Sequence, residues 1–262
     1  MRVICWNLRR AGQNSPAWDY FSELDPDVAL LQEVGSIPSR ITDVYCMISQ
    51  PAITKSGNPQ RFNTAILVRS GETKQFTLTC SIPWVDAELR RFAGNLVACQ
   101  TEFATLVSVH SPAWPVDRAR LISHDVTGIK LGQNPDVWVT ELLRASLLEV
   151  DLTGPWVIGG DFNSSETFDY MWGSRPRGNR EILDRMNVLG FTEVLRHSKN
   201  ALTPTFMNAG RSRKVIHQLD HMFVTKGIHK TLRSCDVGDI ERIFGGGLSD
   251  HLPIIADFGL LE

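Results

Sequence analysis

The stretch PWVIGGDFNSSE, residues 155–166, joins an apolar run to two glycines and two polar side chains spaced by two. The short run WVI predicts a covered β-strand, and the glycines predict a tight exit from it. Because side chains alternate along a strand, Asp161 and Asn163 would face one way and Phe162 would point back into the protein. This arrangement would hold an acid and an amide rigidly at the end of a sheet. Asp and Asn also form ordinary turns, so both interpretations remain open at this point.

The size and composition of the chain predict a folded globular protein. A chain of 262 residues can bury a large core as one big domain or two small ones. Because we see no repeat, low-complexity tract or linker, we predict one domain over residues 1–262. An apolar content of 42% and a charged content of 21% are ordinary for globular proteins.

The expected compartment follows from the N-terminus, the cysteines and the hydropathy. The opening MRVICWN enters a strand-like pattern at once and leaves no room for a signal peptide. The five cysteines are scattered and never in CxxC spacing, which is typical of small buried side chains in a reducing compartment. No apolar run reaches the length of a membrane span. We therefore expect a cytoplasmic protein without a membrane partner.

The charge of the chain is close to balanced but unevenly distributed. A net charge of −2 argues against a protein that coats nucleic acid by charge alone. Residues 164–217 nevertheless hold nine Arg or Lys and five acids. Without a site beside it, this segment is interpreted as a solvated surface.

Apolar runs bounded by polar or glycine turns predict strands, and helical spacing predicts helices between them. We expect helices at 16–24, opened by Ser15 and Pro16, and at 115–126, 136–150 and 180–190. Helices and strands alternate early, whereas strands pair locally elsewhere, so the fold class is mixed α and β. The predicted strands are RVICWN, DVALLQE, FNTAILVRS, NLVACQ, TLVSVH, PWVIGGD, QLDHMFVT and PIIADF.

Several of these strands end at, or follow, a polar residue of a kind used in catalysis. If the strands share one sheet edge, these side chains converge on one pocket, where like charges would repel unless a cation lay among them. Oxygen donors without clustered Cys or His suit a hard ion, Mg²⁺ or Mn²⁺, and such an ion beside histidines suits phosphoryl chemistry. The residues are Asn7, Glu33, His110, Asp161, Asn163, Asp220, Ser249, Asp250 and His251.

In their order and spacing, the segments ICWNLRR, LLQEVG, GGDFN and SDHLP resemble the endonuclease/exonuclease/phosphatase superfamily. Its members include pancreatic deoxyribonuclease, AP endonucleases, sphingomyelinases and inositol-polyphosphate phosphatases. The resemblance covers nearly the whole chain, and the combination is specific although no single piece is. It implies a four-layer α-β-β-α sandwich of two packed mixed sheets flanked by helices.

The resemblance also implies a role for each matching position. Glu33 is similar to the family's principal metal ligand, with Asn7 and Asp250 in the shell of the same ion. Asp161 matches the carboxylate that orients or deprotonates the attacking water, and Asn163 the amide that donates to the phosphate or the nucleophile. The remaining matches are His251, which touches the scissile phosphate, Asp220, which fixes the tautomer of His251, and His110, which stabilises developing charge or protonates the leaving oxygen.

One departure from the family concerns His110. The pancreatic enzyme supports its equivalent histidine with a glutamate in a preceding strand, but the matching stretch here, QRFNTAILVRS, offers Asn63 and no carboxylate. General-acid action by His110 is therefore less well supported than its presence near the phosphate. A histidine satisfied within the core is the alternative.

The motifs define the reaction better than the substrate. The stretch VIHQLDH lacks the PAWCDR-type sequence of the inositol-polyphosphate phosphatases, which disfavours that branch. Arg or Lys beside aromatic side chains suits contact with a nucleic-acid backbone and stacked bases, so we predict a nuclease acting on DNA or RNA. A hydrolase of a lipid or small-molecule phosphate and a non-catalytic binding module are the alternatives. The candidate substrate-binding residues are Arg118, Tyr170, Trp172, Arg175, Arg177, Arg211 and Arg213, with Arg120 as an alternative to Arg118.

Overall fold

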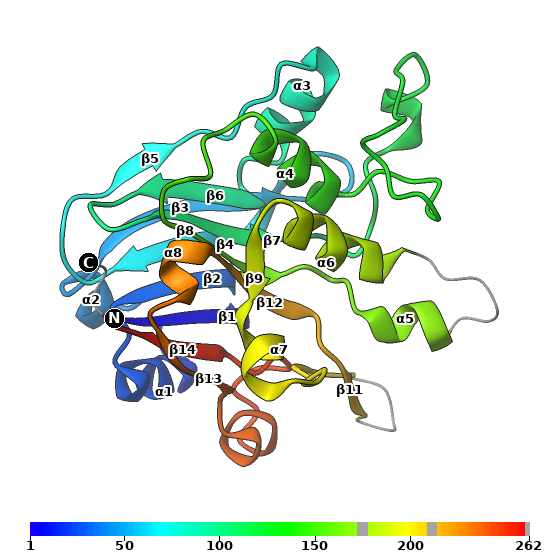
Figure 1. The fold of residues 1–262 in the computed structure, drawn as a ribbon. Coiled ribbons are helices and arrows are strands. Elements are labelled where there is room, and N and C mark those ends of the chain that lie inside the picture. Colours follow the sequence, from blue (N-terminus) through cyan, green and yellow to red (C-terminus); the bar gives the residue numbers. More distant parts are fainter. Residues whose placement is uncertain (172–177, 209–213, 260–262) are drawn as a thin grey trace.

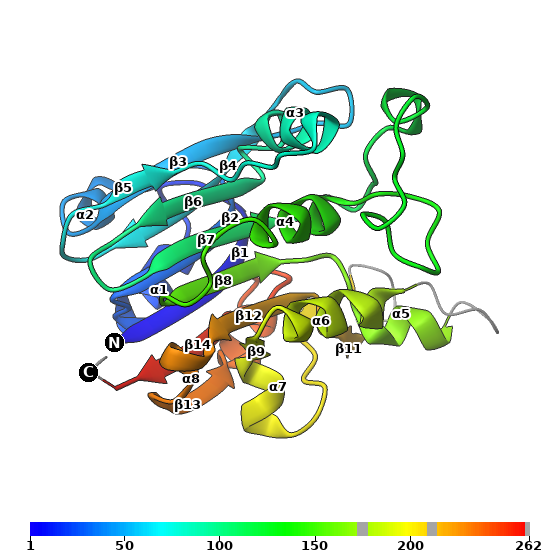
Figure 2. The ribbon, with the colours of Figure 1, turned by 45° about the horizontal axis from the view of Figure 1, so that its top comes forward.

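Two β-sheets pack face to face over residues 1–171, 178–208 and 214–259, the part of the chain that the computed structural model describes (Figure 1, Figure 2). In the first sheet the strand order is β13 (Leu232–Val237), β14 (Ile254–Phe258), β1 (Arg2–Ala11), β2 (Val28–Val34), β4 (Pro59–Val68) and β3 (Cys46–Ile53). In the second it is β5 (Lys74–Phe76), β6 (Leu96–Gln100), β7 (Thr105–His110), β8 (Trp156–Asp161), β12 (Asp220–Thr225) and β9 (Phe191–Glu193). A short hairpin joins β10 (Phe206–Met207) to β11 (Val215–His217).

Both sheets are mixed. Strand β1 runs parallel to β2, and β7 runs parallel to β8, whereas the other neighbours within the two sheets are antiparallel. The parallel pairs lie at the centre of each sheet, so the carboxyl ends of β1, β2, β7 and β8 lie at corresponding ends of the two sheets (Figure 1).

Helices cover the outer faces of the sheets (Figure 1, Figure 2). Those packed on the first sheet include α1 (Ala17–Leu24) and α2 (Ser39–Thr42). Those packed on the second include α3 (Pro83–Arg91), α4 (Val139–Leu147) and α6 (Asn179–Val188). The other helical segments are α5 (Glu166–Met171), α7 (Val194–Lys199), α8 (Lys226–His229), a 3₁₀ turn at Arg118–Arg120 and a π-helical turn at Glu241–Gly245.

The alternation of strand side chains builds the layers. In β1, Val3 and Cys5 are buried between the sheets, whereas Ile4 and Trp6 are buried on the outer face, in the cluster that contains α1. Because both faces of β1 are covered here, residues 3–6 are continuously apolar instead of alternating. The layers confirm the four-layer sandwich that the family resemblance implies.

The central strands lie where the sequence predicted them, but one predicted helix is wrong. Residues 115–126 form only the 3₁₀ turn at 118–120. Asp117 and Asp125 each accept a hydrogen bond from the main-chain N–H two residues ahead, at Ala119 and Thr127. The bond of Asp117 caps the 3₁₀ turn. The predicted helix is absent because the apolar residues of the segment do not form one face packed on the protein, as the 85% exposure of Ile122 shows.

The described helices include none long and apolar enough to cross a membrane.

Candidate active site

Strand register brings four of the predicted residues to one end of the sandwich. In the second sheet His110 lies opposite Asp161, and Asp161 lies opposite Asp220. From the first sheet, Asn7 Nδ2 donates to Asp161 Oδ2 at 3.0 Å and so links the two sheets. All four side chains are buried.

Asp161 and Asn163 are held by the turn that follows β8. Gly160 has a φ of 155°, and a Cβ atom there would lie 1.8 Å from the carbonyl oxygen of Val109, so only glycine fits. The main-chain N–H of Asn163 donates to Asp161 Oδ1 at 2.9 Å, and its amide Nδ2 donates to the carbonyl oxygen of Ser111 at 2.6 Å. The segment after β8 is therefore a turn, and its hydrogen bonds also hold the side chains of Asp161 and Asn163 in fixed positions.

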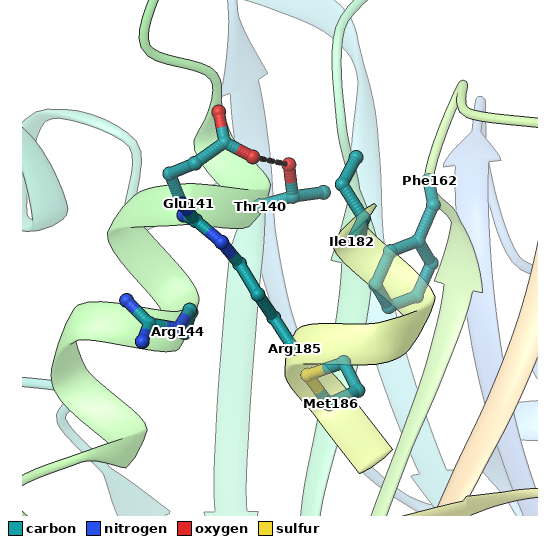
Figure 3. A pocket seen from close by; sticks show the side chains of 7 residues that line it. All are labelled: Thr140, Glu141, Arg144, Phe162, Ile182, Arg185 and Met186. Atoms are coloured by element: carbon teal, nitrogen blue, oxygen red, sulfur yellow. Dashed lines mark hydrogen bonds between the residues drawn. The ribbon is translucent and has the colours of Figure 1, made fainter. Parts of the chain in front are cut away.

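Phe162 points away from this site, as the alternation predicts. It is buried and lines a small pocket with residues of α4 and α6 (Figure 3). The cavity volume is about 10 Å³, which is at most the room for one water molecule. Phe162 thus anchors the turn that carries Asp161 and Asn163. The other lining residues are Thr140, Glu141, Arg144, Ile182, Arg185 and Met186.

His251 is fixed between two carboxylates. Its Nδ1 lies 2.8 Å from Asp220 Oδ2, and its Nε2 lies 3.9 Å from Asp161 Oδ2. Because a carboxylate only accepts, Nδ1 carries a proton. Burial alone would lower the pKa of His251, but the charges of Asp220 and Asp161 and the bond to Asp220 outweigh it and raise this pKa to about 10. Burial raises the pKa of Asp161, and Asp220 adds to this while His251 opposes it.

The main chain around His251 is anchored by side chains of other segments. Ser249 Oγ accepts from the N–H of His251 at 3.1 Å and donates to the carbonyl oxygen of Asn7 at 2.7 Å. Trp6 Nε1 donates to the carbonyl oxygen of His251 at 2.9 Å. Thr205 Oγ1 donates to Asp220 Oδ2 at 2.6 Å. The imidazole is therefore positioned from both sides of the sandwich.

Glu33 and Asp250 flank the end of β1, where each meets an arginine. Arg10 Nε lies 3.5 Å from Glu33 Oε2, and Arg9 Nε lies 3.4 Å from Asp250 Oδ2. Glu33 directly follows Gln32, which pairs in register with Asn7. The predicted metal ligands therefore gather around the end of β1.

Strained backbone is concentrated at the same place. In the described part of the chain, the positive-φ residues other than glycine include Asp25 and Asn200, which end α1 and α7. The remaining four all lie in the site segments: Arg9, Arg10, Glu33 and Asn163. Strain of this kind, about 1–3 kcal/mol for each residue, is typical of functional sites.

His110 has different surroundings from His251. Its Nδ1 lies 3.4 Å from the amide Nδ2 of Asn95, its Nε2 lies 3.9 Å from Glu33 Oε1, and its ring forms a T-shaped pair with Phe62. Burial lowers the pKa of His110 to about 4, and the charges of His251 and Arg10 act in the same direction. The partner of His110 Nδ1 is thus the amide of Asn95, one residue before β6, and not a carboxylate or Asn63.

Two sets of side chains offer metal-ligand atoms. Asp161, Asp220 and His251 place ligand atoms within 4.8 Å of one another, and Asp161 Oδ2, Asp220 Oδ2 and His251 Nδ1 make the hydrogen bonds described above. Glu33 and Asp250 keep 23% and 20% of their side chains exposed and meet their arginines only at long distance. Together with Asn7, whose Oδ1 accepts from the N–H of Arg9 at 3.0 Å, they offer the oxygen donors that a hard divalent cation prefers.

The predicted substrate-binding residues are only partly described. Tyr170 at the end of α5 is 75% exposed. Arg118 Nε donates to Asp136 Oδ1 at 2.5 Å, and Arg120 pairs with the buried Glu88. The remaining predictions lie outside the described residues: Trp172, Arg175, Arg177, Arg211 and Arg213.

Sequence reasoning missed several residues that shape this site. Arg9 and Arg10 lie two and three residues after the predicted strand end at Asn7, and this nearness was the signal that could have identified them. Asn95 and Thr205 stand alone among apolar or turn residues and carry no such signal. They become important only through neighbours that are distant in the sequence.

Comparisons with known proteins agree with the fold described above. A sequence model described as the endonuclease/exonuclease/phosphatase family matches residues 4–251. A search of curated proteins found no match.

Several solved structures share the fold. They include a Neisseria 3′ phosphatase, NExo, bound to a product DNA hairpin, with 17% identity, a TM-score of 0.66 and coverage of 99% of this chain and 100% of that chain. An AP endonuclease from Archaeoglobus fulgidus has 18% identity, a TM-score of 0.69 and the same coverage. The endonuclease domain of TRAS1, a telomere-specific non-LTR retrotransposon, has 17% identity and a TM-score of 0.61, with coverage of 100% of this chain and 99% of that chain.

Proposed function

Because the chain belongs to the endonuclease/exonuclease/phosphatase family, and is thus a phosphoric ester hydrolase, we propose that it is a Mg²⁺-dependent nuclease that hydrolyses phosphodiester bonds of DNA or RNA. The observation that carries this proposal is the convergence of Asn7, Asp161, Asp220 and His251 from both sheets on one hydrogen-bonded centre. We assign the whole chain, residues 1–262, to one catalytic domain, since both sheets contribute to this centre.

In this proposal Asp161 acts as the general base and Asn163 acts as a hydrogen-bond donor beside it. Asn7 and Asn163 fix the Asp161 carboxylate, so it can orient a water molecule and accept its proton as the oxygen attacks phosphorus. Burial raises the pKa of Asp161, which strengthens it as a base near neutral pH. Asn163 donates to the phosphate or to the nucleophile.

The two histidines serve the phosphate. His251, positively charged near neutral pH, donates to a non-bridging phosphate oxygen and offsets the charge that develops there. Asp220 holds this imidazole by its Nδ1. His110 donates a hydrogen bond toward the leaving oxygen as the phosphorus–oxygen bond breaks.

Glu33, Asn7 and Asp250 would hold the metal. Mg²⁺, or Mn²⁺ in its place, would supply positive charge that stabilises the negative charge of the reacting phosphate. The partly exposed carboxylates of Glu33 and Asp250 support this assignment.

Two observations support the proposal that the substrate is a nucleic acid. One structural neighbour is bound to a product DNA hairpin, and others are named as an AP endonuclease and a retrotransposon endonuclease domain. Tyr170 is a large exposed aromatic side chain on α5, the helix that follows the GGDFN turn. We propose that it stacks on a base, and that Arg118 and the basic residues at 175–177 and 211–213 contact backbone phosphates.

We also propose a cytoplasmic location. All five cysteines are free, which suits a reducing compartment.

The test is a substrate panel with the purified protein and Mg²⁺. Labelled single-stranded DNA, duplex DNA, duplex containing an abasic site, 3′-phosphorylated DNA and RNA are compared with bis-p-nitrophenyl phosphate and a phospholipid. Asp161→Asn and His251→Ala serve as inactive controls for contaminating nucleases. Cleavage of a nucleic acid that both substitutions abolish supports the proposal. Hydrolysis of a small or lipid phosphate alone would replace the substrate class.

A further inference from the structure

Asn95 is a buried amide that joins the two sheets directly behind His110. Its side chain is 0% exposed, and it lies one residue before β6. Its Oδ1 accepts from the N–H of Ile53, at the end of β3 in the first sheet, at 3.1 Å. Its Nδ2 donates to the carbonyl oxygen of His110, at the end of β7 in the second sheet, at 2.9 Å. One side chain thus links an edge strand of the first sheet to a candidate catalytic histidine.

The backbone is shaped to allow this contact. A Cβ atom on Gly94 would lie 1.8 Å from the carbonyl oxygen of Pro51, so only glycine lets the chain pass so close to β3. The main chain of Asn95 adds two further bonds: its carbonyl oxygen accepts from the N–H of His110 at 2.8 Å, and its N–H donates to Phe92 at 2.7 Å. Asn95 is therefore fixed at both main chain and side chain.

These partners determine which way the amide faces. Ile53 offers a main-chain N–H, which requires an oxygen opposite it, and His110 offers a carbonyl oxygen, which requires an N–H. The reversed amide would place donor against donor and acceptor against acceptor. The Nδ2 group must therefore face His110.

The same Nδ2 group lies 3.4 Å from the ring Nδ1 of His110. Since Nδ2 has only protons to offer, Nδ1 is the acceptor and the ring proton resides on Nε2. That nitrogen faces the candidate site, 3.9 Å from Glu33 Oε1. The long Nδ2–Nδ1 distance makes this a weak bond, but its direction is set by the two stronger bonds of the amide.

We propose that Asn95 is a positioning residue that holds His110 as its Nε2–H tautomer, so that His110 acts on the substrate as a hydrogen-bond donor. This inference rests on the proposed phosphodiesterase function for its catalytic meaning. The tautomer itself follows from the protein's own contacts and does not depend on the substrate.

The first measurement needs no variant. Long-range ¹H–¹⁵N correlation spectra of the full-length protein with Mg²⁺ distinguish the protonated from the unprotonated ring nitrogen of His110, assigned by comparison with His110→Gln. We expect the proton on Nε2. A proton on Nδ1 would overturn the proposal.

The second measurement uses Asn95→Asp, which keeps the shape of the side chain but replaces the donor with an acceptor. An aspartate at this position favours a proton on Nδ1, so the tautomer signature should change. We expect kcat to fall about 10- to 100-fold with KM nearly unchanged, as for residues that orient catalytic groups. Asn187→Asp, on an exposed position of α6, makes the same change of charge and should leave both constants unaltered.

The outcomes separate this inference from the proposed function. If Asn95→Asp folds and leaves both the tautomer and kcat unchanged, Asn95 does not position His110. If the variant does not fold, the tautomer of the unmodified protein still decides. If the Nε2–H tautomer is present but no phosphodiester is hydrolysed, the proposed function fails and the tautomer assignment stands.

Discussion

Two buried histidines face the same candidate site and are supported in opposite ways. His251 is 5% exposed and His110 is 6% exposed, so burial does not distinguish them. The Nδ1 of His251 meets the carboxylate of Asp220, whereas the Nδ1 of His110 meets the amide of Asn95. The pKa of the first is raised to about 10, and that of the second is lowered to about 4.

The comparison indicates that the neighbours of the ring, more than its burial, set the charge of each histidine. A carboxylate compensates for the cost of burying a charged ring, so His251 remains an imidazolium at neutral pH. An amide gives no such compensation, so His110 stays neutral. One site thus holds a charged imidazolium and a neutral imidazole, which the proposed function uses as two different hydrogen-bond donors.

The largest expected effect on activity comes from removing His251, the charged histidine of the pair. His251→Ala should lower kcat roughly 10³- to 10⁴-fold on the substrate identified by the panel, because both a proton donor and a positive charge are lost. Circular dichroism should show an unchanged fold. A loss below tenfold would mean that His251 does not act on the reacting phosphate.

The substitution Asp220→Asn places an amide beside the Nδ1 of His251, as Asn95 does beside the Nδ1 of His110. We expect the pKa of His251 to fall toward or below its ordinary value and kcat to fall about 10²- to 10³-fold. Single-residue NMR titration measures the pKa directly. An unchanged pKa would show that Asp161, not Asp220, supports the charge.

The same substitution predicts a change in the pH dependence of stability. A raised folded-state pKa means that His251 stabilises the folded protein below about pH 6.5, and that this contribution is lost as the pH rises through about 10. The fall in unfolding free energy between these pH values should therefore be smaller in Asp220→Asn. Denaturant titrations in EDTA at about pH 7 and about pH 9.5 make the comparison.

A smaller effect is expected at the neutral histidine. His110→Gln retains an N–H donor, so we expect kcat to fall only about tenfold, against roughly 10²-fold for His110→Ala. Equal losses in the two variants would argue that the imidazole transfers a proton instead of donating a hydrogen bond.

The smallest effect on activity is expected from Ser249, whose hydroxyl anchors the main chain of His251. Ser249→Ala removes the hydroxyl between the carbonyl oxygen of Asn7 and the N–H of His251. Unfolding free energy should fall by about 1–3 kcal/mol, because buried main-chain groups lose a partner. Activity should fall only severalfold. Ser234→Ala, on the exposed strand β13, is the matched control and should change neither.

Much of the fold could be predicted because its central strands are covered on both faces. Runs such as RVICWN and PWVIGGD are apolar for that reason, and every predicted strand lies within or overlaps an observed one. The edge strands β3, β5 and β13 were not predicted, since their mostly half-exposed or exposed residues lack a continuous apolar run. At 115–126 the helical spacing gives only a 3₁₀ turn capped by Asp117, because the apolar residues of the segment do not form one packed face.

The candidate site also contains residues that the sequence could predict and residues that it could not. Asp161 and Asp220 lie at strand ends that the register of the second sheet brings together, and Asn163 and His251 lie in the segments next to strand ends. Their catalytic and metal-binding roles remain predictions. The amide that supports His110 could not be predicted, because the contact arises from the pairing of β6 with β7 and from the approach of β3.

The most direct test is to determine the protonation of both histidines in one sample. At about pH 7.5 and without added metal, ring ¹⁵N and ¹³C shifts should show His251 protonated on both nitrogens and His110 protonated on Nε2 alone. Two rings in the same charge state, or a charged His110 beside a neutral His251, would contradict the division of roles proposed for this site.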